Sequence, residues 1–195
     1  MHVYTDDPLQ SPVFPSELAD WARLDSDDPM INTALQLASS AVLAFTKQDF
    51  TTRTWILTYA DWPTLGTKMR YSISPNDYAY VKRIELPYAN LVSVDSVFIN
   101  GVEETDYRII KGKPYSIELD TIGYDQQDTD ALVITYKAGY GESTADVPEA
   151  IRNAIKMTAA YIIEHNGACD SGDAVKLSGA KNLLVPYAVR AGITL

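Results

Sequence analysis

The chain has 195 residues, of which 46% are hydrophobic, and its formal net charge is −10. This length predicts one domain, or one domain with an elaboration, and the apolar fraction is sufficient for a hydrophobic core. The negative charge argues against nucleic-acid binding through the general surface, because phosphates would be repelled. No apolar run is long enough to predict a membrane span. Residues 1–18 lack the basic start and apolar block of a signal peptide, so synthesis in the cytoplasm is expected.

Charge is distributed unevenly along the chain. Residues 1–30 carry seven acidic side chains and one basic one, whereas residues 171–195 carry three basic side chains and one acidic one. Such asymmetry suits a protein that meets copies or partners in a fixed orientation, and a merely solvated surface explains it equally well.

The first 50 residues predict an extended arm followed by two helices. Three prolines interrupt residues 1–15, so this arm is predicted to be extended. Residues 16–24 predict a short helix that Ser16 can cap. The next helix is predicted to begin with Asp28 as the N-cap and Pro29 at the first helical position, and to run to about residue 47. Its apolar face is predicted from a helical period to contain Ile31, Leu35, Ala38, Val42 and Phe45.

Residues 51–138 are predicted to be mostly β, because apolar and polar residues alternate there. Asn100–Gly101 is a strong signal for a hairpin turn, and the short connections predict antiparallel pairing. Residues 61–77 are predicted to form a hairpin or long loop that protrudes from the sheet. The expected strands are residues 51–60, 80–87, 90–101, 115–120 and 130–139, with a weaker candidate at 69–74 and a return through 106–112.

The C-terminal part is predicted to be helical again. Pro148 and Glu149 open a helix that Gly167 closes. After a predicted loop at residues 168–173, a shorter helix begins near Ser178 and is stopped or kinked at Pro186. The predicted fold class is α+β: a small bundle of N- and C-terminal helices with an inserted, mostly antiparallel sheet. The expected parts are an arm (1–15), a helical core (16–50 and 147–185), a β insertion (51–138) and an apolar docking tail (186–195).

No catalytic signature is found. The glycines of residues 137–143 lack the lysine and spacing of a phosphate-binding loop, and His2 and His165 are the only histidines. Cys169 is the single cysteine, which excludes an internal disulfide, and nothing completes a nucleophile around it and His165. A calcium loop is matched only loosely by Asp125, Asp128 and Asp130. We therefore predict no catalytic residue, no metal ligand and no cofactor.

Aromatic residues are abundant, with 13 tyrosines and three tryptophans. Aromatic side chains on strands could stack single-stranded bases, but that use needs interleaved basic residues. The strands here alternate with acids, so core packing and protein interfaces explain the aromatic residues better.

Several motifs occur together in a fixed order. Residues 136–141 read Tyr-x-Ala-Gly-Tyr-Gly, Val147 and Pro148 open a helix, and Tyr161 and Glu164 lie near its end. Residues 181–189 contain Leu-Leu-x-Pro-Tyr, and residues 83–109 contain Leu-Pro, a Val-Ser-Val strand, a turn glycine and Asp-Tyr. In this order the chain from about 16 to 190 resembles the gp6-like family of phage head–tail connector (adaptor) proteins. The 61–80 segment is longer than in the common form of that family, and Arg190 follows the Pro-Tyr pair at a distance of three residues instead of directly.

The resemblance implies a structural protein of the virion neck and no enzymatic activity. The family forms a ring, usually of twelve copies, beneath the portal protein, extends the DNA channel and supports the next neck or tail protein. DNA would pass through the lumen without specific binding, and we expect some acidic residues to line it. Local geometry, beside the resemblance, predicts structural roles for four residues: Gly139 and Gly141 permit a sharp exit from the last strand, and Pro29 and Pro148 fit the first helical turn. The resemblance implies portal docking by Leu183, Leu184, Pro186, Tyr187, Val189, Arg190, Ile193 and Leu195.

Three other functions stay open on the sequence alone. One is a tail-terminator or other neck-completion ring, which is also a structural ring protein but stacks at a different level of the particle. Another is a monomeric β module that binds a carbohydrate or other ligand, and the third is a hydrolase with a carboxylate pair. Oligomeric state separates the ring proteins from the last two, and copurification with a portal protein separates a connector from a terminator.

Overall fold

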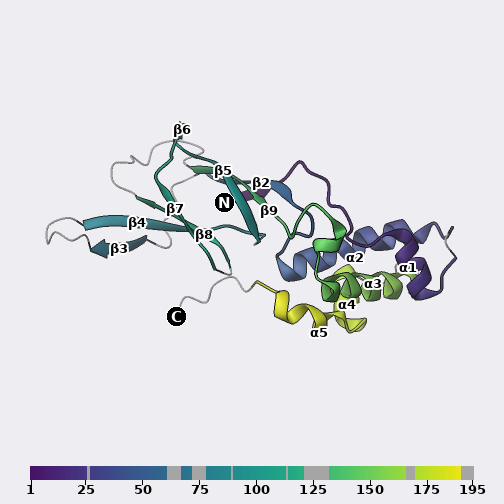
Figure 1. Ribbon diagram of the computed structural model, residues 1–195. Coiled ribbons are helices and arrows are strands. Elements are labelled where there is room, and N and C mark those ends of the chain that lie inside the picture. The colour runs from purple at the N-terminus through teal and green to yellow at the C-terminus, as the bar shows by residue number, and fades with distance from the viewer. Residues whose placement is uncertain are drawn as a thin grey trace. The chain divides into compact units, whose positions relative to one another are not determined.

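The computed structural model describes residues 1–25, 27–60, 67–71, 78–88, 90–112, 114–120, 132–165 and 170–189 (Figure 1). The chain divides into two compact units, each of which is described by itself. The helical unit contains the described residues of 7–52 and 139–189, and the β unit contains those of 1–6 and 53–138. The predicted α+β fold class, with a helical bundle from both ends of the chain and an inserted sheet region, is confirmed. Among the described residues, no helix is long and apolar enough to cross a membrane.

The helical unit is a bundle around one apolar core (Figure 1). Its longest helices, α2 (Met30–Thr46) and α3 (Glu149–Glu164), pack against each other, and the shorter helices pack around them. The shorter elements are α1 (Pro15–Ala22), α4 (Ser171–Leu177), α5 (Ala180–Leu184) and the 3-10 turns η1 (Thr144–Asp146) and η2 (Val185–Tyr187).

The buried face of α2 follows the sequence prediction, and the helix begins at Met30, one residue after the predicted first position Pro29. A carboxylate oxygen of Asp28 accepts a 2.8 Å hydrogen bond from the backbone N–H of Met30, which satisfies a donor that the helix itself cannot. Pro29 has helical φ and ψ of −65° and −17°. On the predicted face, Phe45 is partly buried and the other four residues are buried: Ile31, Leu35, Ala38 and Val42.

Two helix starts differ from the prediction. The helix α1 begins at Pro15, one residue before the expected cap Ser16, and Phe14 occupies the N-cap position without a side-chain hydrogen bond. Proline fits the first helical position because its missing N–H has no intrahelical partner there. Pro148, in contrast, has an extended ψ of 135° and precedes α3, so it lies outside the first helical turn. Its carbonyl accepts a 2.9 Å hydrogen bond from the backbone N–H of Ile151.

The helix α4 occupies part of the predicted loop at residues 168–173. The side chain of Asp170 accepts hydrogen bonds from the backbone N–H groups of Gly172 and Asp173, at 2.7 and 3.4 Å. This capping offsets the low helix propensity of glycine in the first turn. Ala174 and Val175 are buried in the core of the helical unit, so tertiary packing also supports the helix. The expected closing residue of α3, Gly167, lies outside the described residues.

The β unit consists of two antiparallel sheets. In the five-stranded sheet the order is β1 (His2–Tyr4), β2 (Arg53–Tyr59), β9 (Leu132–Ala138), β5 (Leu91–Ile99) and β6 (Val102–Glu103). In the four-stranded sheet it is β3 (Thr67–Tyr71), β4 (Tyr78–Glu85), β8 (Ser116–Asp120) and β7 (Tyr107–Ile110). Buried side chains from both sheets form one core, so the unit is a small β sandwich.

The predicted hairpin at Asn100–Gly101 is confirmed. Both residues have positive φ, 50° and 77°, as a type I′ turn requires, and the flanking residues Ile99 and Val102 pair directly. The predicted extended arm, in contrast, also contains a strand: β1 pairs with β2 and forms one edge of the five-stranded sheet. At the predicted hairpin or long loop of residues 61–77, β3 pairs with β4 from Tyr71–Tyr78 to Thr67–Lys82, and residues 61–66 and 72–77 lie outside the described residues.

Candidate docking site

The described residues form no arrangement that resembles an enzyme active site. A shallow hollow at the β1 edge is lined by Met1, His2, Tyr4, Thr58, Ala60 and Val133. It contains one imidazole and no carboxylate, so it supplies no acid–base pair. Within the described ranges, no group of three or more histidine, cysteine or carboxylate side chains could hold a metal ion. The loosely calcium-like carboxylates of Asp125, Asp128 and Asp130 lie outside the described residues.

His165 has a structural environment at the end of α3. Its ring stacks on Tyr161 with centroids 3.9 Å apart, and its Nδ1 lies 2.9 Å from the carbonyl oxygen of the same tyrosine. The backbone N–H of His165 donates to the same carbonyl at 3.2 Å, so the ring adds a second polar contact at the helix C-terminus. Cys169, considered in the sequence as a partner of His165, lies outside the described residues.

The C-terminal segment is attached to the end of α2. Gln48, which is fully buried, donates a 2.5 Å hydrogen bond from its Nε2 to the carbonyl oxygen of Tyr187. The hydroxyl of Tyr140 donates to Oε1 of the same glutamine. Two residues further along, the backbone N–H of Val189 donates to the carbonyl of Thr46 at 2.9 Å. The segment is therefore positioned through residue 189 by specific polar contacts.

The expected docking residues separate into buried and exposed groups. Leu184 is fully buried in the helical core, so it holds α5 in place and presents no surface. Leu183 is 36% exposed, Val185 is 48% exposed, and Pro186 is also exposed. Val185 was not among the residues expected to dock. Tyr187 and Val189 are partly buried. Three further expected residues, Arg190, Ile193 and Leu195, lie outside the described residues.

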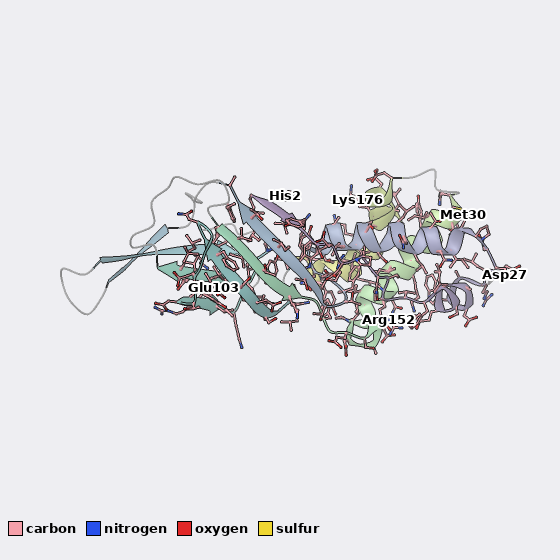
Figure 2. All side chains as sticks on the ribbon, turned by 90° about the horizontal axis from the view of Figure 1, so that it is seen from above. His2, Asp27, Met30, Glu103, Arg152 and Lys176 are labelled. Atoms are coloured by element: carbon pink, nitrogen blue, oxygen red, sulfur yellow. The ribbon has the colours of Figure 1, made fainter. Side chains whose placement is uncertain are left out.

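Exposed apolar and basic side chains lie together along this part of the chain. Leu177, at the end of α4, is 64% exposed, and Lys176 and Lys181 are exposed on α4 and α5. Figure 2 marks Lys176 on α4. With Leu183 and Val185 they give residues 171–187, which we call the α4–α5 segment, a mixed apolar and mildly basic character. The Nζ of Lys176 pairs with the Asp173 carboxylate at 3.0 Å, and with Lys181 the segment has a net charge of +1, in contrast to the acidic N-terminal 30 residues. This composition suits a protein contact with an acidic or neutral partner.

Two glycines leading from β9 into the helical unit are required by close contacts. A Cβ on Gly139, whose φ is +156°, would lie 2.5 Å from the backbone carbonyl atoms of Thr51. A Cβ on Gly141 would overlap the Asp146 carboxylate, which accepts a hydrogen bond from the Ser143 N–H. Glycine is therefore required at both positions, because neighbouring atoms leave no room for a Cβ.

Comparison with solved structures shows the same fold over the full length of the chain. One match is a chain from the neck of an empty gene transfer agent (GTA) particle computed with C6 symmetry. Another comes from the neck of a native GTA particle computed with C12 symmetry; each of these two has a TM-score of 0.69 and 17% sequence identity. A third, from the virion of a native GTA particle, has a TM-score of 0.65 and 15% identity. All three alignments cover 100% of this chain and 99% of the other.

The chain has the fold of these GTA chains. No family model matches the sequence, and no curated protein matches it. At 15–17% identity the agreement concerns the fold, and it includes both the helical unit and the β unit.

Proposed function

We propose that the chain is a structural subunit of the neck of a tailed phage or phage-like particle, where it acts as the head-to-tail connector. The observation that carries the proposal is the full-length agreement in fold with chains from GTA necks. A partial match could reflect one common domain, whereas this match covers a helical bundle with an inserted β sandwich. The order of motifs in the sequence supports the same function independently.

The connector would form a ring, and we propose twelve copies. The neck structures that share the fold were computed with C6 and C12 symmetry, which is compatible with copies arranged around an axis. A closed ring requires a heterologous interface, in which each copy contacts its neighbour through two different surfaces. The ring would lie beneath the portal protein, extend the DNA channel and offer a platform to the next neck or tail protein.

The α4–α5 segment and the residues after it are proposed to dock on the portal. Its exposed apolar side chains, Leu183 and Val185, give it a surface to bury, and the hydrogen bonds at Tyr187 and Val189 fix its direction. A contact that is already ordered loses less conformational entropy on binding than a free tail would. The net charge of −10 suits the channel, because negatively charged walls do not hold phosphates.

Mass photometry of the purified chain, alone and mixed with its cognate portal ring, tests the connector proposal. We expect either a ring of this chain or a portal whose mass increases by about twelve subunits, as a closed cyclic assembly requires. A ring that leaves the portal mass unchanged would instead favour a tail terminator or another neck-completion protein. A monomer that leaves the portal mass unchanged would favour a different position in the neck or tail, or the ligand-binding β module.

A matched pair of substitutions tests the docking segment. In Leu183→Glu/Val185→Glu, two exposed side chains become charged while the buried Leu184 is kept, and we expect portal binding to weaken. The control Val92→Glu/Val102→Glu introduces the same two charges at positions of the β unit that are 58% and 70% exposed. Equal portal binding by the double variant and the control would contradict docking through α5.

A further inference from the structure

The helix α2 exposes a face without ionisable side chains. None of its 17 residues is Asp, Glu, Lys or Arg. Its buried side faces the helical core, and the opposite side is exposed to solvent. Met30 marks the start of this helix in Figure 2. The exposed residues, which we call the α2 face, are Asn32, Thr33, Gln36, Leu37, Ser40 and Ala44.

The α2 face differs from its surroundings. The helical unit contains 13 acidic and 6 basic residues, a net charge of −7. The short helices α1 and α4 carry charged residues on their exposed sides, among them Asp20 and Lys176. Surface helices usually place charged residues opposite their buried stripe. The α2 face carries Leu37, 42% exposed, instead. Core packing does not explain this composition, because the residues concerned point away from the core.

We propose that the α2 face is the surface through which one copy of the chain packs against the next copy in a ring. This inference rests on the proposed connector function and assigns its subunit contact. Two chains that each carry a net charge of −10 repel each other at short range. An interface without ionisable groups avoids burying unpaired carboxylates, whose desolvation would be costly. A basic partner would be held better by the acidic surfaces of the unit, whereas a neutral face suits a partner that is itself acidic, as a second copy of this chain is.

The side chains of the α2 face also suit close packing. Thr33, Ser40 and Ala44 are small, which lets a neighbouring helix or strand approach closely, and Leu37 supplies apolar area. Asn32 and Gln36 can donate and accept hydrogen bonds at the rim of a contact. Because a ring interface is heterologous, the α2 face would meet a different surface of the neighbouring copy.

Charge insertion provides the first test, with the full chain and its portal. The variant Gln36→Glu/Ala44→Glu places two carboxylates on the α2 face at positions two helical turns apart, with good helix formers at both sites. The control Gln10→Glu/Ala145→Glu adds the same two charges at exposed positions outside α2. We expect the α2 variant to need about tenfold or more protein for half-maximal ring assembly, and the control to assemble like the unmodified chain. Equal assembly by the variant and the control would overturn the α2 interface while leaving the connector function intact.

A photo-crosslinking residue at position 37 identifies what covers the face. After irradiation of the assembled ring, a covalent dimer of this chain supports the proposal. A crosslink to the portal or another neck protein, or no crosslink in an intact ring, would overturn it. An unmodified chain that neither forms a ring nor adds to the portal would contradict the connector function itself, and the α2 interface with it.

Discussion

The side-chain amide of Gln48, just beyond the end of α2, is hydrogen-bonded at 2.5 Å to the backbone carbonyl of Tyr187, 139 residues later in the chain. The same amide accepts a hydrogen bond from the hydroxyl of Tyr140. One buried side chain thus links the first half of the helical unit, the start of its second half and the C-terminal segment. A buried carbonyl without such a partner would carry a desolvation penalty.

Replacement of Gln48 by leucine is expected to lower the free energy of unfolding by about 1–3 kcal/mol, because at least one polar partner of Gln48 then lacks a buried hydrogen bond. The C-terminal segment should lose protection before the rest of the helical unit does. Amide hydrogen exchange at residues 184–189, apart from Pro186, which has no N–H, should accelerate more than exchange in the middle of α3. The control Gln10→Leu changes an exposed residue and should leave both quantities unchanged. Unaltered exchange at 184–189 in the Gln48 variant would show that other contacts hold the segment.

Gly139 and Gly101 offer a comparison between a crowded and an open glycine. In Gly101→Ala the backbone φ of 77° is strained for alanine but nothing lies within 4 Å of the new Cβ, so a loss of about 1 kcal/mol is expected. In Gly139→Ala the Cβ would also meet the Thr51 backbone, and the loss should exceed about 2 kcal/mol. Urea unfolding followed by circular dichroism measures both. A smaller loss at Gly139 than at Gly101 would contradict the steric argument.

The sequence predicted those parts of the fold that local rules determine. The helix α2 was predictable because its cap, its proline and its apolar period all agree, and the turn at Asn100–Gly101 was predictable because few residue pairs adopt two positive φ values. The strand β1 was missed because three residues carry no period, and its pairing with β2 depends on tertiary contacts. The helix α4 was missed because Gly172 suggests a loop, although Asp170 two residues earlier is a cap signal.

The candidate docking surface was predictable only in outline. The apolar character of residues 183–189 is visible in the sequence. No local rule, however, distinguishes the adjacent leucines, of which Leu184 is fully buried and Leu183 is 36% exposed. Which of them faces outward depends on how α5 packs on α3. The anchoring role of Gln48 was equally invisible, because its partners at positions 140 and 187 are brought together only by the fold.

Tyr59 makes the stability of the β unit depend on alkaline pH. Burial raises the pKa of its phenol above the ordinary value of 10.0, and the nearby Glu85 carboxylate raises the pKa further. The folded chain therefore keeps a proton that the unfolded chain releases. The contribution of this phenol is fully present below pH 10.0 and is lost as the pH rises through the higher folded pKa.

The Tyr59→Phe variant should accordingly lose less stability than the unmodified chain when urea unfolding at about pH 8 is compared with unfolding at about pH 11. Glu85→Gln should partly reduce the stability lost between about pH 8 and about pH 11, because it removes the Glu85 charge, the smaller of the two causes of the raised pKa, and leaves the burial of Tyr59. Equal pH dependence of the unmodified chain and Tyr59→Phe would show that the phenol titrates as it does in the unfolded state.

The ion pair between Glu17 on α1 and Arg152 on α3 is expected to contribute about 1 kcal/mol to the helical unit. One guanidinium nitrogen of Arg152, Nη2, lies 2.7 and 2.9 Å from the two carboxylate oxygens, and the side chains are 24% (Arg152) and 33% (Glu17) exposed. Partial burial makes such a pair stronger than one between two freely solvated groups, but it also makes an unpaired arginine costly. Glu17→Gln should therefore destabilise the chain more when Arg152 is present than when the chain already carries Arg152→Met. A double-mutant cycle by urea unfolding measures this coupling. A coupling energy near zero would mean that apolar packing of Leu18 and Ala19, both buried, is sufficient to hold α1 on the bundle.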